Sequence, residues 1–304
     1  MKVAITGATG FVGSRLVERL HAEQQEIIAW VRQPDRARQQ FPAAKFPQVT
    51  IVPYTPLEKG PWQESIEGCD AVINLAGEPI ADRWTPQKQQ AILDSRALGT
   101  QRIVEAINQA ANPPQVLVNA SAVGYYGASE TATFVEDNPP GNDFLSKVCQ
   151  DWEAAAQRIT APNCRVVILR TGIVLAYGGA IERMLLPFQL FAGGPIGSGS
   201  QWFSWIHRDD LVNIIRTTLE QPSWSGIYNA TAPNPVKMAD FCATLGQVLS
   251  RPSWLPVPGF ALELLLGEAA QVVLEGQRVL PQRLLAAGFQ FQYPDLKPAL
   301  EQFL

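Results

Sequence analysis

Gly7-Ala8-Thr9-Gly10-Phe11-Val12-Gly13 is the stretch of sequence that decides the fold. It follows the short apolar run Val3–Thr6 and leads into the amphipathic run Phe11–His21. A β-strand that passes through three glycines at this spacing into a helix is the context in which a glycine-rich loop binds phosphate groups. The stretch therefore predicts a strand, a tight turn and a helix at the start of the chain.

Each glycine of this loop has a separate physical role. Gly7 allows the sharp turn out of the strand, Gly10 lets the backbone approach a pyrophosphate, and Gly13 lets the helix pack closely on the strand. The free N–H groups and the positive end of the helix dipole then attract the negative charge. We expect a dinucleotide here, held by loop residues that include Thr9, Phe11 and Val12; a tight turn that binds no ligand is the alternative.

The first two-thirds of the chain alternates between strand-like and helix-like segments, which is typical of βαβ units. The expected buried strands are Val3–Thr6, Glu26–Val31, Val49–Val52, Ala71–Leu75, Val116–Asn119 and Val166–Leu169, and the expected helices are Phe11–His21, Pro86–Ala111 and Asp143–Arg158. The fold class is therefore α/β, with a Rossmann-type doubly wound parallel sheet whose strands end along one ligand-binding edge.

The amino-acid composition changes after Arg170, where glycine and proline become frequent. We expect residues 1–170 to form the nucleotide-binding domain, with elements at about 206–230 returning to its sheet. Residues 171–304 are expected to form a smaller C-terminal α/β substrate domain. Within it, the apolar stretch Phe260 to Val273 predicts one helix that packs in the core.

Composition excludes several classes of protein. The net charge is −4 and no run of Lys and Arg occurs, which argues against a nucleic-acid partner. No apolar run reaches the roughly 20 residues of a membrane span. The four cysteines are scattered and only two histidines occur, so we expect no metal site and a reducing, cytoplasmic location. The chain begins directly with a strand, and we expect no signal peptide.

The end of the second expected strand indicates which cofactor binds. NAD-binding proteins usually carry Asp or Glu there, to bond the ribose 2′-hydroxyl. This strand ends Ala29-Trp30-Val31-Arg32, with no carboxylate and with an arginine that suits the 2′-phosphate of NADP. Arg36 and Arg38 lie close by in the sequence. We predict NADP(H); the alternative is a solvated arginine.

Small residues follow the fourth expected strand, in the sequence Leu75-Ala76-Gly77-Glu78. Small side chains at the carboxyl end of a strand let a ligand approach the backbone. We expect these four residues to contribute to the cofactor site, although the same residues also suit a simple turn.

Further motifs resemble extended short-chain dehydrogenases/reductases, the branch that contains nucleotide-sugar epimerases. They are Ser121 ahead of Tyr125 and the segment Trp205-Ile206-His207-Arg208-Asp209-Asp210. More narrowly, the chain resembles a subgroup known only as "epimerase family". Its marks are Ser121–Gly127, Phe144-Leu145 before Trp152-Glu153, Gly193–Trp202 and Gly276–Pro281.

The resemblance runs the whole length of the chain and implies a Rossmann domain with NADP(H) and a C-terminal substrate domain. It implies an oxidoreductase or an epimerase-like enzyme acting on an unidentified small molecule. Cyanobacterial and chloroplast relatives of this subgroup have been linked to cell or plastid division.

The catalytic pair of the ordinary superfamily members is absent. They place Tyr-x-x-x-Lys on one helix, where the lysine lowers the tyrosine pKa and the tyrosine moves a proton. Alignment on Trp152-Glu153 puts Leu145 and Cys149 at these two positions. Lys147 has Asp143 and Asp151 four residues away on either side, which is typical of a solvated, ion-paired helix face.

Ser121 and Tyr125 are the candidate catalytic residues that remain, with Tyr126 less favoured. Ser121 lies where ligands bind and can hydrogen-bond a substrate carbonyl or hydroxyl. Packing between domains is the alternative for both tyrosines. We interpret His207 as structural, since no partner for a general acid is evident; the resemblance implies that an Asp caps the helix after it.

Trp84, Trp202 and Trp205 are the candidate substrate-binding residues, because aromatic rings beside a cleft can stack on a planar ligand or a sugar. Ordinary interface packing is the alternative. Two functions remain open at this point. One is an NADP(H)-dependent oxidoreductase or epimerase-like enzyme; the other is a catalytically degenerate NADP(H)-binding regulatory protein with a protein partner.

Overall fold

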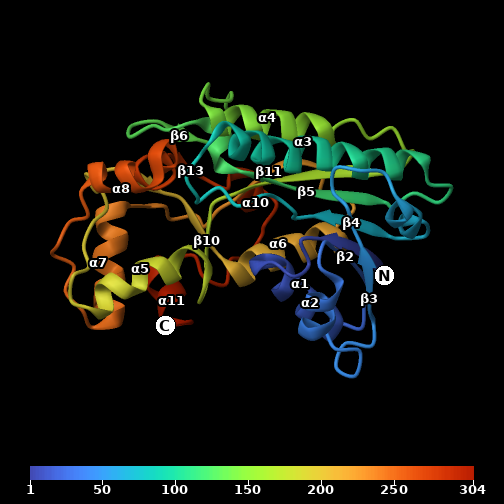
Figure 1. The fold of residues 1–304 in the computed structure, drawn as a ribbon, viewed down its shortest axis with the longest axis horizontal. Helices are drawn as coiled ribbons and strands as arrows, with labels where there is room; N and C mark the ends of the chain where they lie inside the picture. Colours follow the sequence, from blue (N-terminus) through green and yellow to red (C-terminus); the bar gives the residue numbers. More distant parts are fainter.

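A parallel sheet of seven strands forms the centre of the molecule, in the order β11-β7-β5-β4-β1-β2-β3 (Figure 1). The computed structural model describes residues 1–304, apart from the side chains of residues 180 and 183. The strands are β1 Lys2–Thr6, β2 Glu26–Val31, β3 Val49–Pro53, β4 Ala71–Asn74, β5 Val116–Ala122, β7 Arg165–Thr171 and β11 Gly226–Ala230. All six strand pairings are parallel, which confirms the expected Rossmann-type sheet.

Helices cover both faces of this sheet, because alternate side chains of each strand point to opposite sides. Val3 and Ile5 pack with one helical layer and Ala4 packs with the other. The first layer contains α1 Phe11–Ala22, α2 Pro34–Gln40 and α6 Arg208–Glu220; the second contains α3 Pro86–Gln109 and α4 Phe144–Ala156, beside the short 3₁₀ helix η1 Pro61–Ile66. Figure 1 shows α3 and α4 together on one side of the sheet and α1 and α6 on the other.

Two strands run further than their apolar sequence predicts. β5 continues to Ala122 and β7 continues to Thr171, and Ser121 pairs in register with Arg170. Both of these polar residues are buried. Their hydrogen bonds compensate for the loss of water, so the ladder continues where the hydrophobic pattern has already stopped.

Buried polar side chains connect the ends of three central strands beneath the glycine loop. The Thr6 hydroxyl donates to Asn74 Oδ1 (2.7 Å) and accepts from the backbone N–H groups of Leu75 (3.0 Å) and Ala76 (3.1 Å). The Asn74 amide donates to Asn119 Oδ1 (2.7 Å) and to Thr100 Oγ1 (2.9 Å). This network holds the turn after β4 close to the turn after β1.

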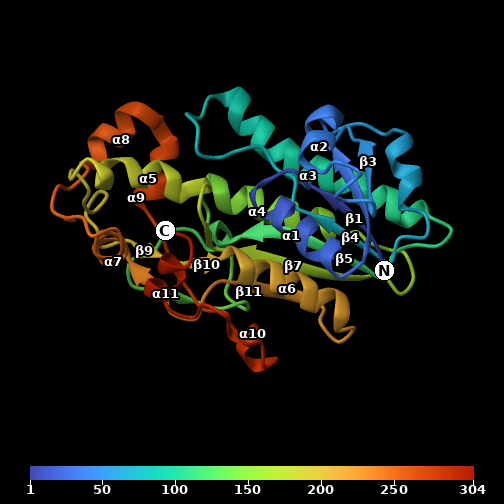
Figure 2. The ribbon, with the colours of Figure 1, turned by 90° about the horizontal axis from the view of Figure 1, so that it is seen from below.

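The chain after β7 builds a second, smaller lobe. Its helices are α5 Gly179–Gln189, α7 Met238–Leu249, α8 Gly259–Leu266, η3 Gly267–Ala270, α9 Gln271–Leu274 and α11 Leu296–Glu301, and Figure 2 shows α5, α7 and α8 at one end of the molecule. The short helix α10 Gln282–Ala286 instead packs on the sheet layer, where Leu284 joins the core beside β11. Short strands pair as β8 Ile173–Leu175 with β10 Trp205–His207, and as β9 Trp202–Phe203 with β12 Val236–Lys237. A third pair, β6 Thr133–Phe134 with β13 Arg278–Val279, connects the lobe to a loop of the first half (Figure 1).

The apolar stretch Phe260 to Val273 does not form the single core-packing helix that its composition predicts. Gly267 has a φ of +59° and divides the stretch into α8, η3 and α9. Phe260, Leu264 and Leu265 on α8 are largely exposed. The expectation was wrong because hydrophobicity alone does not show whether another element covers a helix. Among the described residues, no helix combines the length and hydrophobicity needed to cross a bilayer.

His207 connects the sheet layer to the second lobe and is fully buried. Its Nδ1 accepts from the Asp209 N–H (3.2 Å) and its Nε2 lies 3.1 Å from the side-chain oxygen of Gln302 on the chain's last helical turn. Burial lowers the pKa of His207, which favours the neutral ring. The structural interpretation of His207 therefore agrees with its contacts, but the expected Asp cap was wrong, since the histidine itself caps α6.

We predict that Gly13→Ala destabilises the chain by about 1–3 kcal/mol or more, the usual cost of overpacking. A Cβ at this position would lie 2.1 Å from the Gly7 carbonyl oxygen. Gly99→Ala is the matched control, since the nearest atom there is 3.8 Å away and the site is helical. Alanine in a helix should stabilise it by about 0.5–1 kcal/mol. Urea unfolding measures both variants; equal stability of the two would contradict the packing role of Gly13.

We also predict that the free energy of unfolding falls between about pH 9 and pH 11. Burial raises the pKa of the Cys242 thiol from 9.0 to about 11. In this window the unfolded chain loses the proton and the folded chain retains it, so stability decreases as pH rises. Cys242→Ala should make this decrease smaller by up to about 2 kcal/mol. Leu245→Ala on the same helix is the control, because it lowers stability without changing the pH dependence; identical slopes for all three proteins would refute the assignment.

Candidate functional site

The glycine loop has the geometry of an anion site. Gly7 has a φ of +67°, and a Cβ on it would lie 3.0 Å from backbone atoms of Leu75. The Gly10 N–H donates to the Gly7 carbonyl (2.9 Å), and α1 begins at Phe11 without a side-chain cap. No acidic residue occupies the first turn of α1. Its N–H groups and the positive end of its dipole are therefore available to a negatively charged group.

A cavity of about 260 Å³ opens at this loop. It lies at the carboxyl ends of the strands, where β1 stands between β2 and β4 and the strand order reverses direction. Its walls include four groups of sequence-predicted residues: Gly7, Thr9 and Gly10 of the loop; Arg32 after β2; Leu75, Ala76, Gly77 and Glu78 after β4; and Arg36 at α2. Phe11, Val12 and Gly13 are not among the lining residues and form the first turn of α1 instead.

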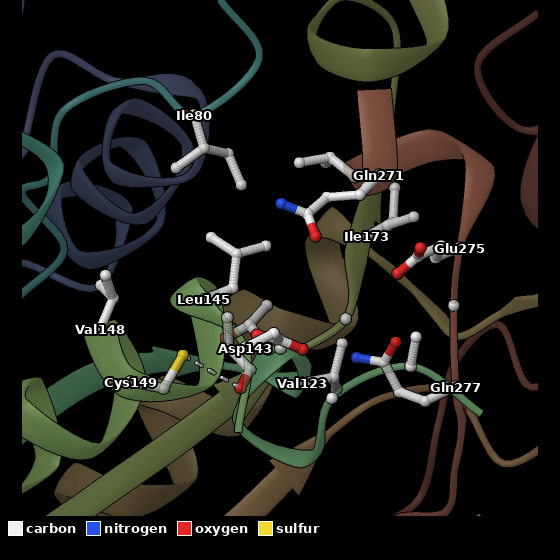
Figure 3. Close-up of a pocket in the computed structure, with 18 of the residues that line it drawn as sticks. Ile80, Val123, Asp143, Leu145, Val148, Cys149, Ile173, Gln271, Glu275 and Gln277 are labelled. Atoms are coloured by element: carbon white, nitrogen blue, oxygen red, sulfur yellow. Dashed lines mark hydrogen bonds between the residues drawn. The ribbon is translucent and has the colours of Figure 1, made fainter. Parts of the chain in front are cut away.

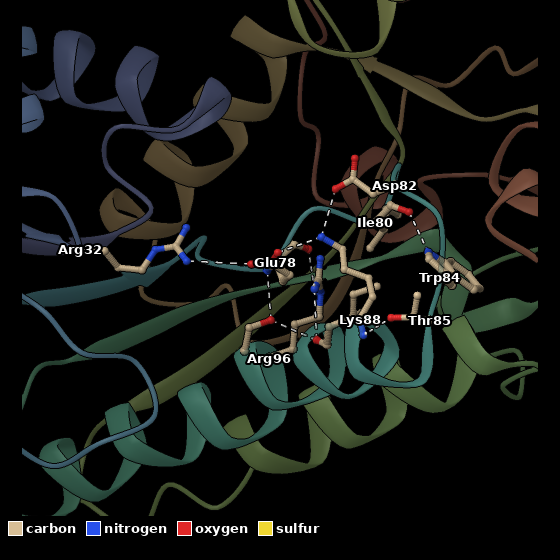
Figure 4. Close-up of polar contacts among 10 residues, drawn as sticks. Arg32, Glu78, Ile80, Asp82, Trp84, Thr85, Lys88 and Arg96 are labelled. Carbon is tan, nitrogen blue, oxygen red and sulfur yellow. Dashed lines mark hydrogen bonds and ion pairs between the residues drawn. The ribbon is translucent and has the colours of Figure 1, made fainter. Parts of the chain in front are cut away.

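Glu78, which lines this cavity, is reached by two positive charges from different sides, Arg32 and Lys88 (Figure 4). Arg32 is 68% exposed and lies 3.9 Å from Glu78, a distance at which an exposed ion pair contributes little. The other Glu78 oxygen accepts a much closer bond from Lys88 (2.8 Å). Arg36 has no ion pair among the described side chains, whereas Arg38 pairs with Asp35. Arg32 and Arg36 therefore remain available to a phosphate group.

A second cavity, of about 440 Å³, lies between the sheet layer and the smaller lobe (Figure 3). Ile80, Leu145 and Val148 form an apolar wall on the side of α3 and α4. The polar ends of Gln271 and Glu275 face this wall from the smaller lobe. The two cavities adjoin each other at two places in the chain. Glu78 and Ser95 line the smaller cavity, and their neighbours Ile80 and Arg96 line the larger one. A ligand extending from the first cavity would therefore enter the second.

Ser121 lines this larger cavity and is held by a buried ion pair. Its hydroxyl donates to Glu153 Oε1 (2.6 Å). Arg170 donates to both oxygens of the same carboxylate at 2.8 Å, a bidentate pair with almost no exposure. Because the serine hydrogen is directed at Glu153, the free lone pairs of its oxygen remain for a ligand.

The two tyrosines pack around the same arginine. The Arg170 guanidinium lies 3.3 Å from the centre of the Tyr125 ring. The Tyr126 hydroxyl, on the short 3₁₀ helix η2 Val123–Tyr126, accepts from Arg170 (3.0 Å) and donates to Asn229 Oδ1 (2.7 Å). Neither ring is among the residues that line the larger cavity. The structure therefore places Tyr125 with the ion pair and does not bring it to the cavity wall beside Ser121.

Leu145 and Cys149 line the cavity on one face of α4, at the positions of the absent Tyr and Lys. Burial raises the pKa of the Cys149 thiol to about 11, so the thiol is neutral at ordinary pH. Its sulfur lies 3.7 Å from the Ala122 carbonyl oxygen. Lys147 points away to solvent and pairs with Asp151 (2.6 Å), which confirms its surface interpretation. This face of α4 therefore offers neither a proton donor of ordinary pKa nor a positive charge.

The three candidate tryptophans lie in different surroundings. Trp202 lines the cavity, and its ring is in contact with the cations of Lys237 (4.0 Å) and Arg278 (4.9 Å). Trp84 packs in a buried cluster beside the cavity and donates to the Ile80 carbonyl. Trp205 is fully buried in the core of the smaller lobe. Trp84 and Trp205 do not line the cavity, so only Trp202 is placed to contact a ligand there.

Sequence reasoning missed Arg96, Gln271, Glu275 and Gln277, all of which line the larger cavity. One signal in the sequence was available for Arg96. None of the residues three or four positions before or after Arg96 is acidic, whereas Lys147 has an aspartate four positions away on each side. Arg96 therefore has no ion-pair partner on its own helix. The described residues contain no cluster of His, Cys, Asp or Glu that would hold a metal ion.

Comparison with known proteins agrees with this arrangement over the whole chain. Residues 3–230 match the NAD dependent epimerase/dehydratase family, and residues 257–303 match DUF1731, a domain of unknown function. A chloroplastic SDR39U1 homolog of Arabidopsis thaliana is 50% identical over 307 residues, covering 100% of this chain and 87% of that protein. The epimerase family protein YfhF of Bacillus subtilis is 40% identical, covering 100% of this chain and 98% of that protein.

A solved structure extends the comparison. The crystal structure of human epimerase family protein SDR39U1 with NADPH superposes with a TM-score of 0.87 at 38% identity, over 100% of this chain and 99% of that one. These matches include both the sheet layer and the smaller lobe. The chain therefore belongs to the NAD dependent epimerase/dehydratase family of extended short-chain dehydrogenases/reductases, with a C-terminal DUF1731 domain and SDR39U1 proteins as homologues.

Proposed function

We propose that this chain is an NADP(H)-dependent oxidoreductase that acts on a small molecule held in the larger cavity. The observation that carries the proposal is that the two cavities adjoin: the glycine loop lines one, and a positioned serine lines the other. The NADPH-bound human relative supports the choice of cofactor. An NADPH molecule so bound supplies a hydride to a carbonyl carbon, and NADP⁺ accepts one from an alcohol.

The residues of the smaller cavity fit such a cofactor. A side chain at Gly7 would collide with the Leu75 backbone, so the glycine lets the two turns that border the cavity approach each other closely. The first turn of α1 supplies N–H donors to the oxygens of the cofactor's pyrophosphate. Arg32 and Arg36 supply positive charge for a 2′-phosphate, and Arg32 has only a distant carboxylate to compete with it.

Ser121 contributes a fixed hydrogen-bond acceptor to the larger cavity. The Ser121 hydroxyl donates its hydrogen to Glu153. Its oxygen is therefore oriented to accept a hydrogen bond from a substrate hydroxyl. Glu153 is a positioning residue in this scheme, since it acts on the substrate only through Ser121. The arrangement matches the alcohol form of a substrate, whereas a carbonyl oxygen requires a donor from another element.

A second candidate function is an NADP(H)-binding regulatory protein that has lost catalysis. Two observations favour it: the Leu145–Cys149 face of α4 lacks the usual proton donor, and α8 exposes Phe260, Leu264 and Leu265. Large exposed apolar side chains on one element are typical of a surface that contacts a partner. A role in division, which the family resemblance suggests, belongs with this candidate. A pull-down that recovers no partner, together with NADPH consumption on a carbonyl panel, would decide against it.

The cytoplasmic location remains a prediction. All four cysteines are free thiols in the structure, which is consistent with a reducing compartment. Fractionation of the native host cell, with an antibody against this chain, measures it directly.

Thermal unfolding with NADPH, NADP⁺, NADH and NAD⁺ tests the cofactor proposal. A ligand at 100 times its Kd stabilises a protein by about 2.7 kcal/mol, so the phosphorylated forms should raise the Tm at concentrations where the others do not. Arg32→Gln and Arg36→Gln should reduce this difference. Arg38→Gln is the control, because Arg38 pairs with Asp35 outside the cavity. Equal shifts with all four nucleotides would contradict the role of the two arginines.

Paired substitutions test the Ser121 proposal. Ser121→Ala should lower kcat about tenfold or more on any substrate found with a panel of alcohols and NADP⁺, and leave NADP(H) affinity unchanged. Glu153→Gln should lower kcat as well, and in addition it should destabilise the chain by about 3–5 kcal/mol, because it leaves the Arg170 charge buried without its partner. Unchanged turnover in Ser121→Ala would refute a catalytic role for this residue.

A further inference from the structure

Arg96 is the only basic residue among the described residues that line the larger cavity. It lies in α3, on the wall that adjoins the cofactor cavity. No ion pair to Arg96 occurs among the described side chains, whereas Arg32 and Lys88 beside the neighbouring cavity both pair with Glu78. The side chain is half-buried, and the nearby Glu78 carboxylate is already ion-paired with Lys88 (2.8 Å). A half-buried guanidinium that makes no ion pair of its own is available to a negatively charged group of a ligand.

The guanidinium of Arg96 is held in a fixed orientation. One terminal nitrogen, Nη1, donates to the backbone carbonyls of Glu78 (3.0 Å) and Ile92 (3.2 Å). The guanidinium carbon lies 5.2 Å from the centre of the Trp152 ring. Gly77 leaves room for it, since a Cβ there would lie 3.0 Å from Cζ and from Nη2. These contacts use only one of its nitrogens, so the Nε and Nη2 hydrogens remain for another acceptor.

Arg96 also lies close to the position where the family's lysine is absent. Arg96 on α3 and Cys149 on α4, the residue at that position, line the same cavity. Ser121 lines the same cavity. The positive charge that α4 does not supply is therefore supplied from α3, on the other helix of the same layer.

We propose that Arg96 binds the reacting oxygen of the substrate and stabilises negative charge on it. This proposal rests on the oxidoreductase function proposed above. When the carbonyl carbon gains a hydride from NADPH, the π electron pair of the C=O bond moves to the oxygen, which then takes a proton from water. Arg96 donates to this oxygen while it is negative, and Ser121 accepts from the hydroxyl once it has formed. A fixed donor in a cavity of low polarity is the kind of group that lowers such a barrier most.

Binding of benzoate and benzamide to the NADP⁺ complex tests the proposal without a known substrate. Benzoate imitates an anionic oxygen, and benzamide is its neutral counterpart of similar shape. Isothermal titration should show that wild type binds benzoate at least tenfold more tightly than benzamide. Arg96→Gln should remove this preference and leave NADPH affinity within about twofold of wild type. Arg96→Lys, which retains the charge without the planar fork, should retain part of the preference.

Two controls separate this role from others. Arg36→Gln should weaken NADPH binding and leave the benzoate preference intact, and Lys147→Gln should change neither. Equal binding of benzoate and benzamide by wild type, or no binding of benzoate, would refute the proposal. Loss of NADPH affinity in Arg96→Gln with the benzoate preference unchanged would assign Arg96 to the cofactor and overturn it as well. Failure of the proposed function is distinguishable, because wild type would then bind NADP(H) without reducing NADP⁺ on any alcohol of the panel, whatever its benzoate preference.

Discussion

The buried ion pair between Glu153 and Arg170 is the interaction on which the rest of the site depends. Two charges removed from water cost several kcal/mol each unless every polar atom finds a partner. Here the carboxylate receives the guanidinium in two bonds and Ser121 in a third, while Arg170 also contacts both tyrosines. The pair joins α4 to β7 and, through Ser121, to β5. The same ion pair thus stabilises the sheet edge and orients the candidate catalytic serine.

The polar groups of the larger cavity do not come from the Leu145–Cys149 face of α4. The helix face that carries Tyr and Lys in ordinary members presents Leu145 and a neutral Cys149. Polar groups enter instead from β5 and α3 on one side and from Gln271 and Glu275 on the other. The cavity therefore keeps an apolar wall opposite a polar one, an arrangement that suits a substrate with a hydrophobic body. Ligand sites of this kind hold orientation with a few placed polar groups.

The parts of the structure that the sequence predicted are those with a local pattern. Strands buried on both faces, the spacing of Gly7, Gly10 and Gly13, and the paired charges around Lys147 each occur within a few residues. The features that the sequence did not predict depend on contacts between distant segments. Ser121 meets a carboxylate 32 residues away, and Arg170 meets Tyr126 44 residues before it. The exposure of α8 depends on which elements cover it, and no periodicity in its own sequence contains that information.

The last strand of the sheet lies far along the chain, and this has a consequence for the order in which the protein forms. β11 pairs with β7 only after residue 230 has been synthesised, and the Glu136 carboxylate then accepts from the backbone of Asn229 and of Arg283. Until those segments leave the ribosome, β7 is an open edge strand and Glu136 lacks its donors. The sheet of the nucleotide-binding half is therefore completed only once these C-terminal segments are available to it.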